Sequence, residues 1–359
     1  MPRVYNFGAG PAVLPVEVLE EAQLELLDYK GSGMSILESS HRGKEYDAVH
    51  QEAIANIQKL LNLTDDYTVL FMQGGASGQF AMVPMNLLPP GQTADYVNSG
   101  TWAKKAIGEA KIVGKVNIAA DTGSALPARM PRADELKLTP GAAYVHITSN
   151  ETIAGSQWKS FPKTEAPLVA DMSSDILSRP FDAKQFGLIY AGAQKNLGPA
   201  GVAIVIIRKD LAEKVPATVP KFLRYSTHIE ENSLYNTPSC FTIYLIMLVT
   251  RWIQKMGPET LYKQNIEKAA RLYAAIDRSG GFYKGTAAGD SRSDMNVTFR
   301  LPSEELEEAF VKEASKLGMK GLKGHRSVGG IRASIYNAFP VDGVDALVAF
   351  MREFQAKQG

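Results

Sequence analysis

The sequence contains very little cysteine and almost no net charge. Its one cysteine among 359 residues, Cys240, cannot form a disulfide within the chain, which predicts a reducing, cytoplasmic location. A formal net charge of +1 gives no electrostatic case for binding to nucleic acid or to an anionic membrane. The longest apolar run, from Phe241 to Val249, is too short to cross a bilayer. The opening MPRVYNFGAGPAVLP lacks an apolar core, so we expect no signal peptide.

The remaining composition is that of a globular protein, with 45% hydrophobic and 21% charged residues. Through the first two thirds of the chain, short β-rich runs alternate with amphipathic segments typical of helices. The strand-like runs lie at 67–72, 93–100, 142–148, 167–171, 187–193 and 202–207, and the helix-like segments at 15–30, 43–63, 79–88 and 101–113. This alternation predicts an α/β fold with a mostly parallel sheet.

The last third has a different pattern. Two long helical segments, 241–256 and 259–279, precede strand- and helix-like segments in alternation. We predict a smaller α+β domain here. The proposed division is a large domain at 16–261 and a small domain made of 1–15 and 262–359, because the glycine-rich start is too short to bury a core of its own.

Lys195 is the strongest candidate for catalysis. It lies in Gln194-Lys195-Asn196, between two apolar runs and beside a Gly/Pro turn, which predicts a strand, a sharp turn and a second strand. Burial between strands would lower the pKa of the lysine amine and make it a nucleophile suited to an aldehyde cofactor. Judged alone, an exposed lysine at a hairpin tip is the more common alternative.

Asp171 follows the apolar run PLVAD. Because the carboxyl ends of parallel strands face the ligand crevice, this carboxylate could pair with the ring nitrogen of pyridoxal 5'-phosphate. The alternative is a helix or turn cap, which the following Ser173 and Ser174 also favour.

A glycine-rich turn, with Gly74, Gly75 and Gly78, joins a strand to a helix in LFMQGGASGQF. Backbone N–H groups at such a helix start can bind one phosphate, although a purely structural turn is as plausible. Trp102 follows another strand end and could stack on a planar ring or be a half-buried helix-start aromatic.

Basic side chains occur beside glycines as His41-Arg42, His325-Arg326 and Arg332. Arginine binds carboxylate and phosphate groups in a bidentate manner, so these residues could form an oxyanion pocket. Each dipeptide taken alone is more often surface decoration.

The motifs NFGAGPAVLP, SHRGKEY, LFMQGGASGQF, SNETIAG, VADMSSDILSRP, IYAGAQKNLGPAG and LKGHRSVGGIRASIYNA occur in order along nearly the whole chain. Together they resemble the phosphoserine aminotransferase family of class V aminotransferases. The resemblance implies a fold-type-I transferase dependent on pyridoxal 5'-phosphate, with a mostly parallel seven-stranded sheet in the large domain, assembled as a homodimer with active sites at the subunit interface.

The same resemblance implies an activity. L-Glutamate and 3-phosphohydroxypyruvate would be converted reversibly to 2-oxoglutarate and O-phospho-L-serine, a step of serine biosynthesis. Formation of 4-phosphohydroxy-L-threonine in pyridoxine biosynthesis is implied as a possible second role. Another class V aminotransferase acting on a small substrate is the alternative.

Site residues also follow from the resemblance. Lys195 would form the Schiff base with the cofactor and Asp171 would hold its pyridine nitrogen. The other cofactor contacts would be Trp102 on the ring, Thr152 at its polar edge, Ala76, Ser77 and Gln194 at the phosphate, and Asn236 and Thr237 at that phosphate from the neighbouring subunit. Arg332 would bind the substrate α-carboxylate. His41 and Arg42, with His325 and Arg326 from the partner, would bind the substrate phosphate or the glutamate side chain. No metal is implied.

Two positions depart from the family pattern. Many relatives have serine at the position of Ala9, which leaves only backbone for substrate contact here, and several have arginine at Ser77, which removes one candidate cation.

Two rival functions are weaker. A desulfurase of the same fold needs a mobile cysteine, whereas Cys240 lies in a stretch that looks packed. A regulator without turnover would not need Lys195, Asp171 and Arg332 together.

Overall fold

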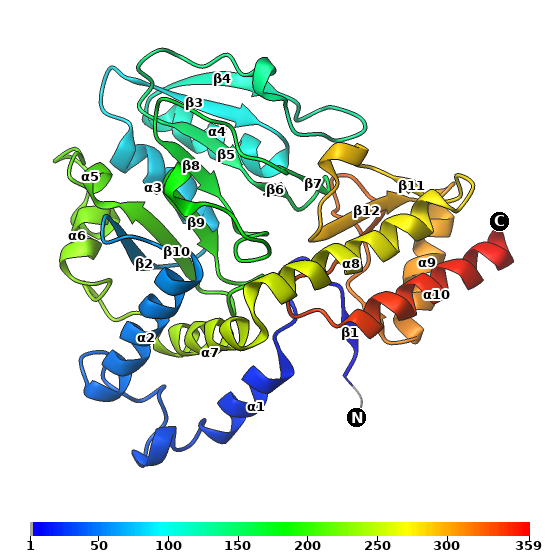
Figure 1. Cartoon of the computed structure of the whole chain (residues 1–359), viewed down its shortest axis with the longest axis horizontal. Coiled ribbons are helices and arrows are strands. Elements are labelled where there is room, and N and C mark those ends of the chain that lie inside the picture. Colours follow the sequence, from blue (N-terminus) through cyan, green and yellow to red (C-terminus); the bar gives the residue numbers. More distant parts are fainter. Residues whose placement is uncertain (1–2) are drawn as a thin grey trace.

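A seven-stranded sheet forms the centre of the computed structural model, which describes residues 3–359 (Figure 1). In spatial order its strands are β2 (Tyr67–Gln73), β10 (Val202–Arg208), β9 (Phe186–Gly192), β8 (Leu168–Asp171), β5 (Val145–Thr148), β3 (Thr93–Asn98) and β4 (Lys115–Asp121). All neighbouring pairs are parallel except those of β10, which runs antiparallel to both β2 and β9. The predicted α/β fold with a mostly parallel sheet is therefore confirmed.

Helices cover both faces of this sheet. One core packs side chains of the sheet against α2 (Lys44–Leu60) and α7 (Cys240–Met256), with α1 (Val16–Leu24) beside them. The opposite core contains α3 (Ala76–Leu87), α4 (Thr101–Val113), α5 (Lys209–Ala212) and α6 (Tyr225–Glu230). Alternate residues of β10 enter opposite cores, Ile204 and Ile206 on one side and Val205 and Ile207 on the other. Burial on both faces explains why these strands are continuous apolar runs.

The remaining elements form a smaller α+β unit. Its sheet of β11 (Lys284–Gly285), β12 (Asn296–Arg300) and β14 (Ile331–Ser334) is antiparallel. Three helices pack with it: α8 (Pro258–Asp277), α9 (Glu304–Lys316) and α10 (Val341–Gln358). Strand β1 (Tyr5–Asn6) pairs with β13 (Met319–Lys320), and Phe7 lies in the same core. The separate core supports the proposed division near residue 262, which stays a prediction because α8 runs through that point (Figure 1).

One local expectation was wrong, and one strand of the large sheet was not predicted. The helix expected at 15–30 ends at Leu24. Leu24 and Leu27 are exposed, so no buried apolar face stabilises a continuation of the helix. Strand β4 was not predicted, since this edge strand is only partly buried and has no continuous apolar run. Within residues 3–359, we find no helix with both the length and the apolar character that crossing a bilayer requires.

Candidate active site

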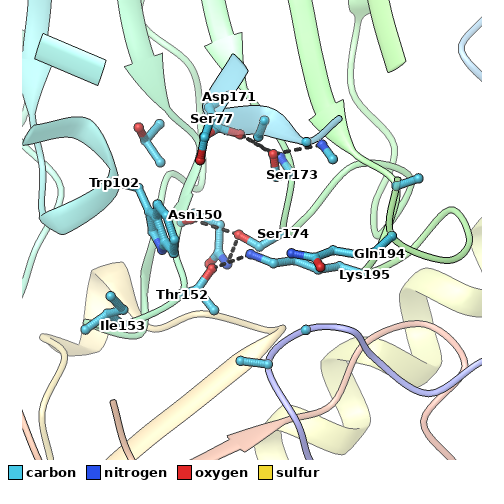
Figure 2. A pocket seen from close by; sticks show the side chains of 18 of the residues that line it. Ser77, Trp102, Asn150, Thr152, Ile153, Asp171, Ser173, Ser174, Gln194 and Lys195 are labelled. Carbon is cyan, nitrogen blue, oxygen red and sulfur yellow. Dashed lines mark hydrogen bonds between the residues drawn. The ribbon is translucent and has the colours of Figure 1, made fainter. Parts of the chain in front are cut away.

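A cavity of about 460 Å³ lies where the carboxyl ends of the parallel strands meet the smaller unit. It brings together most of the side chains predicted from the sequence, although they come from distant parts of the chain (Figure 2). The predicted residues that line it are Ala9, Ala76, Ser77, Trp102, Thr152, Asp171, Gln194, Lys195, His325 and Arg332.

Lys195 lies in the turn between β9 and β10, as the sequence predicted. It is buried rather than exposed at the hairpin tip, with 8% of its surface accessible. Its Nζ donates a hydrogen bond to Thr152 Oγ1 at 2.8 Å (Figure 2). Desolvation lowers the pKa of the amine to about 8, although the nearby Asp171 carboxylate opposes this shift. The lowered pKa makes the neutral, nucleophilic amine far more available near neutral pH than in an ordinary lysine, although the protonated form still dominates at pH 7.

Asp171 ends β8 and is buried at the wall of the cavity. Its Oδ1 accepts hydrogen bonds from the Ser173 N–H at 2.9 Å and from the Ser173 hydroxyl at 2.6 Å. Ser173 Oγ in turn accepts from the Gly192 N–H. The local turn cap considered as the alternative is thus present, but it uses one carboxylate oxygen. Within residues 3–359, Oδ2 has no hydrogen-bond donor, so it can pair with a ligand.

The glycine turn lies at the start of α3, where backbone N–H groups lack partners within the helix. Gly74 has a φ of 95°, a conformation that favours glycine. A Cβ added at Gly74, Gly75 or Gly78 would have no atom from elsewhere in the described chain within 4 Å. The turn therefore leaves open space beside a helix N-terminus, as binding of one phosphate requires.

Trp102 is the second residue of α4 and lies at the side of the cavity (Figure 2). The centroid of its ring is 5.8 Å from Lys195 Nζ. Its indole Nε1 is buried, and no described residue accepts its hydrogen. The ring is placed to stack on a planar group joined to Lys195.

Arg332 and His325 reach the cavity from the smaller unit. Arg332 lies on β14, and its buried Nε has no acceptor among residues 3–359, which suits an anionic ligand. His325 Nδ1 lies 2.7 Å from the Ser327 hydroxyl and accepts from the Ser327 N–H at 3.2 Å, which favours the neutral tautomer with its proton on Nε2. Burial and the charges of Arg332, Arg326 and Lys105 lower the pKa of His325. His325 lines the cavity of its own chain, and its expected contribution to a partner's site stays a prediction.

The other predicted residues lie outside this cavity. His41 and Arg42 lie in the turn before α2, and Arg326 is exposed on the loop before β14. Asn236 and Thr237 lie in the segment before α7, where the Thr237 carbonyl accepts from Gln73 Nε2 at 2.5 Å. Their contacts with a cofactor or substrate stay predictions.

Sequence reasoning missed several polar residues of the site. Asn150 and Ser174 line the cavity and hydrogen-bond to each other at 2.8 Å. Glu151 is buried behind Trp102 and accepts hydrogen bonds from the start of α4. These residues cluster in the polar stretches SNETIAG and DMSSD, which was the sequence signal for a site. Small polar residues in turns are common, however, and the sequence does not indicate which of them point into a cavity.

Comparison with known proteins identifies the family. The aminotransferase class-V family model matches residues 4–347. A phosphoserine aminotransferase from Desulfosudis oleivorans is 59% identical, with 99% of each chain aligned. The solved structure of a phosphoserine aminotransferase from Bacillus circulans subsp. alkalophilus superposes with a TM-score of 0.96 at 56% identity, covering 99% of each chain.

A PLP-bound phosphoserine aminotransferase from Trichomonas vaginalis is a further match. It is 40% identical, with a TM-score of 0.94 over 98% of this chain and 100% of that one. The chain therefore belongs to the class V aminotransferases and, within them, to the phosphoserine aminotransferase family.

Proposed function

We propose that this chain catalyses the reversible transfer of an amino group between L-glutamate and 3-phosphohydroxypyruvate, using pyridoxal 5'-phosphate. The single observation that carries the proposal is Lys195, a buried lysine whose pKa is lowered to about 8 inside the cavity. Similar proteins are named phosphoserine aminotransferase, and the structure of one of them contains bound pyridoxal 5'-phosphate (PLP).

Three observations of this structure support the fit of the residues present to the cofactor. Asp171 Oδ2 is free to pair with a ring nitrogen, the face of Trp102 borders the cavity, and the glycine turn opens beside the start of α3. Lys195, Asp171, Trp102, Thr152, Ala76, Ser77 and Gln194 would hold it. When bound, the cofactor would supply an electron-accepting ring and an aldehyde carbon that carries the amino group between the two acids.

The chain supplies proton transfer and orientation. The neutral Lys195 amine can take the proton from the substrate α-carbon and return one to the reacting group. Thr152 Oγ1 accepts from Lys195 Nζ and so directs the amine within the cavity. Asp171 is buried at the cavity wall, and its carboxylate would favour the protonated form of a ring nitrogen placed beside it.

Arg332 is the candidate for the α-carboxylate, because its unpartnered Nε lies at the cavity. His325 would donate from Nε2 to the second anionic group of the substrate, with Arg326 nearby on the same loop. His41 and Arg42 would complete this pocket from a partner subunit. One pocket would then accept both the glutamate side-chain carboxylate and the phosphate of the keto acid.

The test is a coupled assay with O-phospho-L-serine and 2-oxoglutarate, compared with unphosphorylated L-serine. We expect kcat/KM for phosphoserine to exceed that for serine at least about 100-fold, because losing charge-assisted hydrogen bonds costs about 3 kcal/mol. Equal values for the two substrates would reject the phosphate pocket and favour another class V aminotransferase.

A homodimer is the second part of the proposal. Apolar side chains are exposed in α1 and the segment after it, with Leu24 at 84%, Leu27 at 86% and Leu37 at 57%. In Figure 1 this region extends from the body of the molecule, at the lower edge. His41 and Arg42 follow directly, so a second copy covering the patch would bring them to another active site.

We expect Leu27→Glu to shift the protein from dimer to monomer in analytical ultracentrifugation, because a charge would be buried at the contact. Ile112→Glu, at an equally exposed leucine-sized position on α4 with 80% accessibility, is the matched control and should leave a dimer. A wild-type monomer at micromolar concentration would contradict the proposed assembly.

Two further parts of the proposal concern a second substrate and the cellular location. A role in pyridoxine biosynthesis is proposed from the family alone and would need 4-phosphohydroxy-L-threonine as a tested substrate. A cytoplasmic location stays a proposal from the single cysteine.

A further inference from the structure

Glu151 is a buried acid that the proposed mechanism does not use. Its side chain is completely inaccessible to solvent, and no basic side chain within residues 3–359 forms an ion pair with it. Instead its carboxylate accepts from three groups at one helix start: the Trp102 N–H at 3.1 Å, the Ala103 N–H at 3.0 Å and the Ser99 hydroxyl at 3.3 Å. Burial raises the pKa of Glu151 to about 7, against these hydrogen bonds.

This carboxylate takes the place of an N-cap side chain for α4. The residue at the cap is Gly100, which makes no side-chain cap hydrogen bond. A Cβ at Gly100 would lie 2.6 Å from the Glu151 carboxyl carbon. Gly100 is extended, with a φ of 164°, so glycine is required here by close approach and not by backbone strain. A carboxylate at a helix N-terminus also interacts favourably with the helix dipole.

Glu151 therefore connects two parts of the site. Through its carboxylate it holds the first turn of α4, which carries Trp102. Through the main chain it precedes Thr152, whose hydroxyl accepts from Lys195. The Glu151 carbonyl also accepts from the Gly155 N–H at 2.8 Å, which closes the turn containing Thr152.

We propose that Glu151 is a positioning residue that fixes Trp102 against Thr152 and Lys195, and so sets the width of the slot for the cofactor ring. The inference deepens the proposed function and rests on its cofactor, but not on its substrate. Glu151 contacts neither the cavity nor the reacting atoms, and its effect is exerted through Trp102 and Thr152.

The test uses the full chain with Trp158→Phe and Trp252→Phe, which leaves Trp102 as the only tryptophan. Two variants break the contact in different ways: Glu151→Gln removes the charge, and Gly100→Ala drives a methyl group into the carboxylate. For both we expect stronger acrylamide quenching of Trp102 in the apoprotein and a roughly tenfold higher Kd for pyridoxal 5'-phosphate, the effect of one charge-assisted hydrogen bond.

The matched control is Asp95→Asn. Asp95 is also fully buried and accepts three hydrogen bonds, two from Thr139 and one from Asn117, but it does not line the cavity. It should lower the melting temperature without changing quenching or Kd. Wild-type quenching and Kd in Glu151→Gln, or equal changes in Asp95→Asn, would overturn the inference.

The quenching and Kd measurements still test the inference if one variant does not fold or if the proposed activity is absent. If Glu151→Gln does not fold, Gly100→Ala gives the same two measurements with the carboxylate intact. Because apoprotein quenching needs neither cofactor nor substrate, a chain that failed the phosphoserine assay would still support or refute the role of Glu151.

Discussion

Replacing Lys195 with alanine should lower turnover of phosphoserine with 2-oxoglutarate at least about 10,000-fold, because the variant loses both the nucleophile and the general base. The fold should survive. The lysine makes one side-chain hydrogen bond, to Thr152, and removing an amine that is costly to bury relieves desolvation. A steady-state assay beside a thermal melt measures both quantities.

Added small amines provide the control for this variant. An amine that diffuses into the cavity can accept the proton that Lys195 would accept, so methylamine should restore part of the lost rate. Lys268→Met removes the other buried lysine, which donates to the carbonyls of Ile335, Tyr336 and Phe339. It should reduce stability while the folded protein keeps its turnover. Substantial transamination by Lys195→Ala would refute the assignment.

Asp171→Asn should lower kcat about 100- to 1000-fold, the typical cost of losing one preorganised electrostatic group. The amide keeps an oxygen for the Ser173 N–H but has no charge to hold a protonated ring nitrogen. Stability should change little, because burial already raises the pKa of Asp171 and so disfavours its charged form. The measurement is kcat at saturating substrate, with the melting temperature recorded in parallel.

Asp175→Asn is the control for Asp171→Asn. It tests whether kcat depends on a negative charge at the ring nitrogen or only on a negative charge near Lys195. Asp175 is also buried and also raises the pKa of Lys195, but it hydrogen-bonds Ser149 and Gln157 and lies outside the cavity. We expect Asp175→Asn to reduce kcat far less than Asp171→Asn. Equal losses would mean that Asp171 acts only through the local field.

The sheet and the residues at its strand ends could be predicted from sequence for a physical reason. Strands buried on both faces are continuous apolar runs, so their ends are visible, and the polar residue after each end faces the crevice. Asp171 is the last residue of β8, and Lys195 lies in the turn shortly after the end of β9. Edge strand β4 lacked that signal because it is only partly buried.

Residues that act through tertiary contacts were harder to predict. Glu151 lies one residue from Thr152, yet its importance depends on α4 lying beside it, and Gly100 appears as an ordinary turn glycine until that approach is seen. His325 is distant in sequence from the strand ends, and the loop before β14 brings it to this cavity. Neither fact is encoded in local periodicity.

The central claim is that Lys195 joins the cofactor aldehyde. Borohydride reduction of the holoprotein, followed by proteolysis and mass spectrometry, tests it most directly, because reduction makes such a bond permanent. We predict that the peptide containing Lys195 gains the mass of the reduced cofactor in near-stoichiometric yield. Labelling of Lys105 or Lys268 instead, or an unmodified Lys195 in protein that retains the cofactor, would contradict the account.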